Sequence, residues 1–117
     1  MDQSWTYAEK SALGEMLEAC AWSCRKSADA CLGGSDPGKF AESIRLVVEC
    51  AKLCEITAGY LDKGSAFQDE MLRICAEACD NCRNECERHM QWRHFRECAD
   101  ASGRCETACH AFSEASA

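Results

Sequence analysis

The sequence contains one proline and seven glycines in 117 residues, so it offers few places where a helix must stop. It has no apolar run approaching the roughly 20 residues that a membrane-spanning helix needs. Residues 1–7 provide neither a basic segment nor an apolar one, so no secretory signal peptide is recognisable. We therefore expect a cytoplasmic protein with reduced thiols and no membrane partner.

Basic residues are also fewer than acidic ones. The chain has 13 Lys and Arg against 20 Asp and Glu, which gives a formal net charge of −7. Proteins that bind nucleic acids usually present clustered basic residues, so we expect no nucleic-acid partner. The sequence shows no nucleophile–base pair, phosphate-binding loop or paired carboxylates in an apolar setting, and we therefore expect no enzymatic activity.

Cysteine, by contrast, is abundant, with 12 in 117 residues. The densest run is Cys75, Cys79, Cys82 and Cys86, with separations of 4, 3 and 4 residues. Residues three and four apart share one face of an α-helix, so this run predicts a sulfur stripe along a helix whose other faces are charged. So many cysteines in a short chain usually indicate disulfides or metal.

The same periodicity predicts helices over about residues 6–32, 39–63 and 66–90, and from about residue 94 to about residue 113. Ser4 or Thr6 can cap the first helix, with Glu9 three residues after Thr6 as in a capping box, and the glycine-containing segments 33–38 and 64–65 mark two turns. The boundary near residues 91–93 is placed on helix length alone. Four similar helices with short links indicate an all-α fold, an antiparallel up-down-up-down four-helix bundle in a single domain over residues 1–117.

The inner stripes place all the cysteines in roughly one half to two-thirds of the bundle core. The rest of the core is expected to be an ordinary apolar end, formed by Tyr7, Leu13, Leu61, Phe67 and Phe112. The cysteines predicted to face inward are Cys20, Cys24, Cys31, Cys50, Cys54, Cys75, Cys79, Cys82, Cys86, Cys98, Cys105 and Cys109.

Several kinds of chemistry are compatible with such a core. Cysteine fills space less well than Leu or Ile, so packing alone is a poor reason for this composition. Disulfides would give a stapled structural bundle, and an iron–sulfur or zinc site would suit a sensor or electron-transfer protein. The run differs from ferredoxin spacing, however, and its one Cys-x2-Cys lies within a helix. Cu(I) accepts two or three bridging thiolates, so a sulfur-lined core favours many Cu(I) ions.

With Cys-x3-Cys pairs on all four predicted helices and the run from Cys75 to Cys86, the chain resembles the four-helix-bundle copper storage proteins, in particular their cytosolic branch. The resemblance covers nearly the whole chain. It implies storage or buffering of multiple Cu(I) ions by the inward-facing cysteines and assembly as a homotetramer. We also expect exchange of copper with a chaperone or efflux component.

The resemblance also implies a copper entrance at one bundle end, with His or Met close to it. His89 continues the stripe of the third predicted helix past Cys86, and His94 precedes Cys98 by four residues. We therefore expect His89 and His94 to be ligands at this mouth, in addition to the twelve cysteines.

Overall fold

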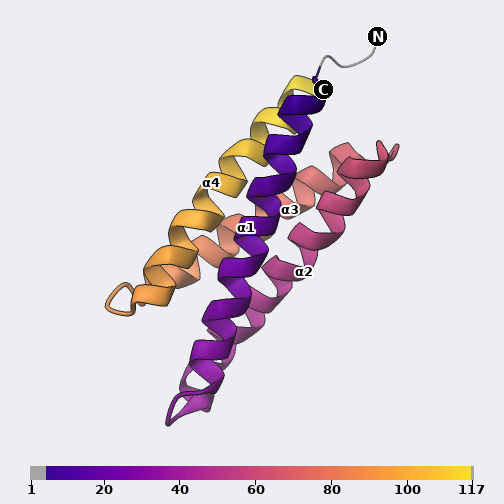
Figure 1. The fold of residues 1–117 in the computed structure, drawn as a ribbon. Coiled ribbons are helices and arrows are strands. Elements are labelled where there is room, and N and C mark those ends of the chain that lie inside the picture. The colour runs from indigo at the N-terminus through magenta and orange to yellow at the C-terminus, as the bar shows by residue number, and fades with distance from the viewer. Residues whose placement is uncertain (1–4, 117) are drawn as a thin grey trace.

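The computed structural model describes residues 5–116 and confirms the predicted all-α fold. Its elements are α1 (Tyr7–Leu32), a short 3-10 helix η1 (Pro37–Phe40), α2 (Ala41–Lys63), α3 (Gln68–Glu87) and α4 (Arg93–Ser116). No strand is present in this part of the chain. Figure 1 shows the start of α1 and the end of α4 at the same end of an elongated antiparallel bundle, which measures 53 × 20 × 20 Å.

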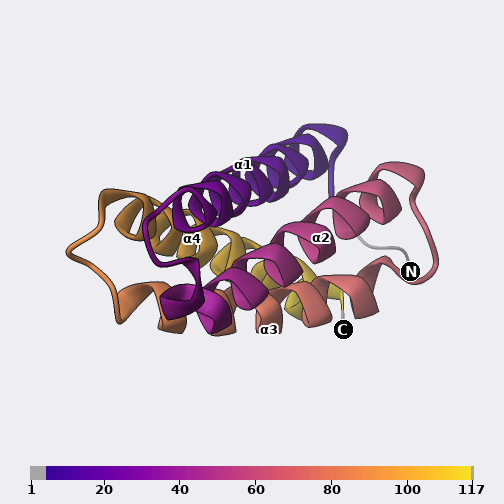
Figure 2. The ribbon, with the colours of Figure 1, turned by 90° about the horizontal axis from the view of Figure 1, so that it is seen from below.

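The helices close a ring around one core. Each helix packs against its neighbour in the chain, and α4 packs back against α1. Figure 2 shows this arrangement, with α2 and α3 side by side below α1. The up-down-up-down topology is therefore confirmed, and side chains on the inner face of every helix share one narrow interior.

Local signals explain where the helices begin and end. The capping box is confirmed, because the Thr6 hydroxyl accepts from the Glu9 backbone N–H at 3.0 Å and Glu9 accepts from the Thr6 N–H at 2.8 Å. The other candidate cap, Ser4, lies outside the described residues. Gly64 ends α2 with a left-handed φ of 65°, a conformation that glycine adopts at little cost. Ser65 accepts from the Phe67 N–H, so it stabilises the turn and α3 begins two residues later than its predicted start.

The predicted end of the third helix is wrong by three residues. The backbone N–H groups of Arg88 and His89 bond to carbonyl oxygens three residues earlier, so the chain tightens and leaves α-helical geometry after Glu87. His89 therefore lies in the link between α3 and α4, not on a helical stripe. The second helix also starts later than predicted, at Ala41, because η1 occupies the residues before it.

The core matches the predicted stripes, except at one end. Leu13, Leu61 and Phe112 are buried as expected. Tyr7 and Phe67, however, are 86% and 66% exposed, so their assignment to the apolar end was wrong. Tyr7 is the first residue of α1 and Phe67 directly precedes α3, so both lie where the bundle no longer covers them. Trp5 stacks on Phe112 instead, with ring centroids 3.8 Å apart.

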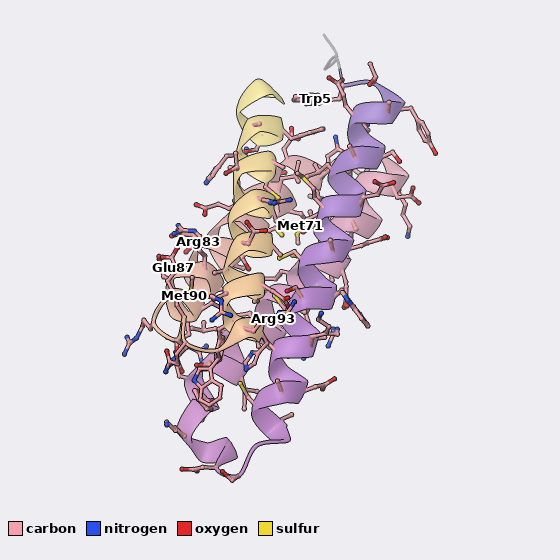
Figure 3. The ribbon with its side chains drawn as sticks, turned by 60° about the vertical axis from the view of Figure 1, so that its left-hand side comes forward. Trp5, Met71, Arg83, Glu87, Met90 and Arg93 are labelled. Carbon is pink, nitrogen blue, oxygen red and sulfur yellow. The ribbon has the colours of Figure 1, made fainter. Side chains whose placement is uncertain are left out.

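Charged side chains cover the outside of the bundle and link neighbouring helices. Arg25 of α1 forms a two-pronged ion pair with Glu55 of α2, at 2.7 and 2.9 Å. Arg83 of α3 contacts Asp80 and Glu87 on its own helix and Glu106 on α4. Figure 3 shows Arg83 and Glu87 on the outer face, with sulfur atoms on the inside. Such solvent-exposed pairs are screened by water and contribute little, so the core carries most of the stability.

None of the helices in the described part of the chain combines the length and the hydropathy that a membrane span requires.

Candidate metal centre

All four helices direct cysteines into the bundle, and all twelve are buried free thiols, none more than 3% exposed. Their inward orientation is therefore confirmed. The cause is the spacing of three and four residues, which keeps each set on the inner face of its helix. The contributions are Cys20, Cys24 and Cys31 from α1, Cys50 and Cys54 from α2, Cys75, Cys79, Cys82 and Cys86 from α3, and Cys98, Cys105 and Cys109 from α4.

Three of these cysteines form a compact triangle, which we call the upper triad: Cys24, Cys82 and Cys98. The three Sγ–Sγ distances are 3.8 Å from Cys24 to Cys82, 3.8 Å from Cys82 to Cys98 and 3.6 Å from Cys98 to Cys24. The centre of such a triangle lies about 2.1 Å from each sulfur, close to the roughly 2.3 Å of a zinc–thiolate bond. The upper triad therefore already has nearly the size of a three-coordinate thiolate site.

Further along the bundle, two sets of four sulfurs overlap, and together they form what we call the lower cluster. In each set all Sγ atoms lie within 4.8 Å of one another, and the sets share Cys54 and Cys79. Cys75 lies 3.6 Å from Cys54, and Cys79 lies 3.8 Å from Cys50 and 4.0 Å from Cys54. The first set is Cys20, Cys50, Cys54 and Cys79, and the second is Cys54, Cys75, Cys79 and Cys105.

The two sulfurs that belong to both sets determine which metal ions the lower cluster can bind. A thiolate that belongs to two sets can bridge two metal ions, as soft monovalent Cu(I) permits. A closed tetrahedral zinc site would instead need one isolated set of four ligands. The lower cluster is therefore better suited to a row of bridged ions than to one structural zinc.

Cys31, Cys86 and Cys109 lie outside these sets but next to them. Cys86 follows Cys82 of the upper triad by four residues on α3, and Cys109 follows Cys105 of the lower cluster by four residues on α4, so each lies one helical turn further along the inner face. Cys31 is also buried, and it lies within the electrostatic influence of Cys98. These three cysteines, the upper triad and the lower cluster together form a row of sulfur atoms along the bundle axis, which we call the sulfur column.

Burial and contacts between sulfurs set the protonation of the column. Burial raises the pKa of the Cys31 thiol, and a charge on Cys98 adds to this effect. Hydrogen bonds with neighbouring thiols, chiefly Cys20, raise the pKa of Cys24. Hydrogen bonds led by the one with Cys24 lower the pKa of Cys82 to about 5. Cys82 therefore gives up its proton more easily than Cys24, and thiolate is the form that binds metal.

Both candidate histidines lie at the end of the bundle where α3 joins α4, and both pack on the fully buried ring of Phe95. The ring centroid of His89 is 5.0 Å from that of Phe95, and the ring centroid of His94 is 4.3 Å from it. His89 Nε2 lies 3.2 Å from a carboxylate oxygen of Glu85. His94 Nδ1 lies 2.9 Å from the Ser27 hydroxyl. The structure thus places both histidines at one end of the bundle, while neither belongs to the upper triad or the lower cluster.

Burial also lowers the pKa of His94, so its ring stays neutral and keeps a nitrogen lone pair for a soft metal. The Ser27 hydroxyl fixes the orientation of this residue by also donating to its backbone carbonyl oxygen at 3.1 Å.

Two polar groups lie near the column, and the first of them was not predicted. Glu85 is only 13% exposed, and it accepts a hydrogen bond of 2.7 Å from the buried Ser43 hydroxyl of α2. The spacing of four residues between Glu85 and His89 could have identified Glu85, because it brings the two side chains together. Ser102 is fully buried among sulfurs, as expected from its place on the inner stripe of the fourth predicted helix.

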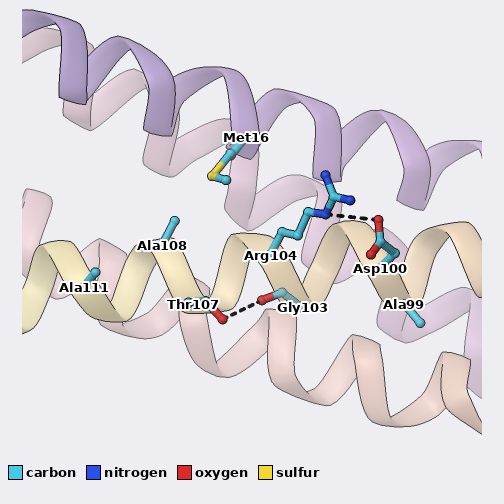
Figure 4. Close-up of a pocket in the computed structure, with 8 residues that line it drawn as sticks. All are labelled: Met16, Ala99, Asp100, Gly103, Arg104, Thr107, Ala108 and Ala111. Atoms are coloured by element: carbon cyan, nitrogen blue, oxygen red, sulfur yellow. Dashed lines mark hydrogen bonds and ion pairs between the residues drawn. The ribbon is translucent and has the colours of Figure 1, made fainter.

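A hollow on the outer surface of α1 and α4 has a different character. Figure 4 shows Met16 of α1 opposite small residues of α4, with Arg104 bonded to Asp100 and Thr107 bonded to the Gly103 carbonyl. No cysteine or histidine is among the residues that line it. This hollow is therefore not part of the candidate metal centre.

A ring of four antiparallel helices around a column of free thiols defines a thiolate-based metal-binding bundle. The sequence profile of the copper storage protein (Csp) family matches residues 6–114, and the chain belongs to this family. The resemblance seen in the cysteine spacing is thereby confirmed, and the described role of the family is storage of a metal.

Individual relatives agree with this assignment. The cysteine-rich protein YhjQ of Bacillus subtilis is 31% identical over 90 residues, which covers 77% of this chain and 82% of YhjQ. A cytosolic copper storage protein from Streptomyces lividans, solved with five coppers, is 31% identical with a TM-score of 0.87, over 92% of this chain and 93% of the other. Cu(I)-bound BsCsp3 is 28% identical with a TM-score of 0.85, over 90% and 98% of the two chains.

Proposed function

We propose that this protein stores or buffers copper by binding multiple Cu(I) ions to the thiolates of its bundle core. One observation carries the proposal: nine buried cysteines fall into three sets, the upper triad and the two sets of the lower cluster, and within each set all Sγ atoms lie within 4.8 Å of one another. Family membership and the copper-loaded neighbours support the choice of metal.

Charge balance explains why many ions fit into a buried core. An isolated ion is very costly to bury, but each Cu(I) that replaces one thiol proton leaves the column neutral. A divalent metal held by four thiolates would instead leave two negative charges in a space of low dielectric. Exchange of protons for Cu(I) therefore lets the number of ions approach the number of thiolates.

The proposed ligands are the twelve cysteines, with His89 and His94 at the mouth. A Cu(I) ion that enters between the histidines next meets Cys86 and Cys31, and then the upper triad. Phe95 packs beneath both histidine rings and holds them near one another. Copper transfer would then proceed between soft or borderline ligands along the bundle axis.

The proposal also covers enzymatic activity, cellular location and assembly. Storage requires no reaction, so we propose that the chain is not an enzyme. We place it in the cytoplasm, where thiols stay reduced, as for the Streptomyces relative described as cytosolic. We further propose a homotetramer that exchanges copper with a chaperone or an efflux component.

The test is an anaerobic Cu(I) titration of the fully reduced protein against a competing chelator, with free thiols counted before and after. We expect 12 thiols at the start, uptake of several Cu(I) ions per chain and loss of nearly all thiol reactivity. Uptake below about two Cu(I) per chain would refute storage. Brown protein with labile sulfide would indicate an iron–sulfur cluster, and few initial thiols would indicate disulfides.

A further inference from the structure

One buried hydroxyl lies in the middle of the sulfur column. The four cysteines of α3 are separated by 4, 3 and 4 residues, and Cys98, Ser102, Cys105 and Cys109 of α4 have the same separations. Ser102 thus holds the second position of an inner stripe whose other three members are cysteines. The spacing directs position 102 into the core as it does the three thiols.

The contacts of Ser102 are those of a thiol in the column. Its side chain is 0% exposed. Its hydroxyl donates to Cys82 Sγ at 3.3 Å and lies 3.7 Å from Cys20 Sγ and 4.0 Å from Cys98 Sγ. Cys82 and Cys98 belong to the upper triad and Cys20 to the lower cluster. Ser102 therefore lies where the two sulfur groups meet.

Other buried serines on the inner stripes have different partners. Ser27 bonds to His94 and Ser43 bonds to Glu85, so both act on the mouth of the bundle. Ser102 differs because all three of these contacts are with thiols.

A serine at this point cannot replace a thiolate. Its hydroxyl stays protonated near neutral pH and offers a hard oxygen, whereas Cu(I) prefers soft sulfur. Between Cys98 and Cys105, a rise of about 10 Å along the helix, the inner face of α4 therefore offers no soft ligand. Copper bound beside Ser102 can use Cys20 of α1 and Cys82 of α3, and it reaches α4 only through Cys98 at the near end of this gap.

We propose that Ser102 occupies a ligand position of the copper column and closes it to copper, which limits capacity where the upper triad meets the lower cluster. This inference rests on the proposed storage function and adds a residue that sets how much copper is stored.

The experiment compares wild type, Ser102→Cys, Ser102→Ala and Ser113→Cys in the same anaerobic Cu(I) titration, with thiols counted and apo helix content checked by circular dichroism. Ser113 is the matched control, because it is buried on the same helix but donates to the backbone oxygen of His110 at 3.3 Å. Ser102→Cys should bind about one more Cu(I) per chain than wild type, as one added bridging thiolate permits. Ser102→Ala should retain wild-type capacity, and Ser113→Cys should gain a thiol without gaining copper.

Three results would overturn the inference while wild type still binds several ions. These are a folded Ser102→Cys protein with wild-type capacity, an equal gain in Ser113→Cys, or a loss of copper in Ser102→Ala. The last result decides the question even if Ser102→Cys does not fold, because it would show that the hydroxyl supports copper binding. If wild type itself binds fewer than about two ions, the storage function fails first and the inference fails with it.

Discussion

Replacing Cys79 and Cys82 together by alanine tests whether the sulfur groups determine copper capacity. Cys79 belongs to both four-sulfur sets of the lower cluster, and Cys82 belongs to the upper triad. The double substitution therefore removes a ligand from every group. The matched control replaces Cys31 and Cys109, which are also buried but lie outside all three sets. Each variant retains ten of the 12 thiols.

The expected loss follows from counting ligands. If each Cu(I) needs two or three thiolates, loss of one ligand from each set should release about three ions per chain, one for each set. The control should lose about one ion, because Cys31 and Cys109 lie next to the groups rather than within them. In the apo protein, each Cys→Ala change removes one buried heavy atom and should cost about 0.5–1.5 kcal/mol, as Ile→Val does.

The assay is a Cu(I) titration of both variants against a competing chelator, with urea unfolding of the apo forms. Helix content should remain close to wild type in both, because alanine is the best helix former. Equal copper losses in the two variants would refute the reasoning, since capacity would then follow the number of thiols and not their grouping. Collapse of the fold with unchanged capacity would instead assign a structural role to the sulfurs.

Three further predictions address the mouth, the thiol protons and a helix cap. Substituting His89 and His94 by alanine should slow Cu(I) uptake in stopped-flow measurements and leave final capacity within about one ion, because neither lies in a sulfur group; a large loss of capacity would contradict a role limited to the mouth. The reduced apo protein should lose stability as pH rises above the ordinary thiol pKa of 9.0, because Cys24 and Cys31 keep their protons when folded and release them when unfolded. Each such thiol should lower the free energy of unfolding by about 1.4 kcal/mol per pH unit, and urea unfolding at constant stability up to pH 10 would contradict this. Thr6→Ala should lower the free energy of unfolding by about 1 kcal/mol through loss of the capping box, whereas an unchanged thermal midpoint would show that the first turn of α1 contributes nothing.

The sequence was sufficient for the fold because its local and global signals agree. Inner stripes at spacings of three and four residues, few helix breakers and short links all indicate four helices, and the structure contains them. The ends were harder to predict. Position alone could not show that Tyr7 and Phe67 extend beyond the packed core, because exposure at a helix end depends on how neighbouring helices are staggered.

The candidate site was predictable as a column but not as separate groups. Helical spacing places each cysteine on an inner face, yet it cannot show which sulfurs from different helices come within 4 Å. Axial rotation and stagger of the helices decide that Cys98 meets Cys24 and Cys82, and that Cys79 meets Cys50 and Cys54. These are properties of packing, which one sequence encodes only through the sum of all its contacts.

Because of how the core is packed, copper binding should affect the stability of the folded bundle. A core of small thiols buries less apolar volume than one of Leu and Ile, so the apo bundle is stabilised less by packing. Bound Cu(I) would link thiolates of different helices, as in the upper triad, whose sulfurs come from α1, α3 and α4. A ligand that binds the folded chain more tightly than the unfolded chain stabilises the fold by mass action. The loaded bundle should therefore be more stable than the apo bundle, and removal of copper should leave the helices in place while it loosens the contacts between them.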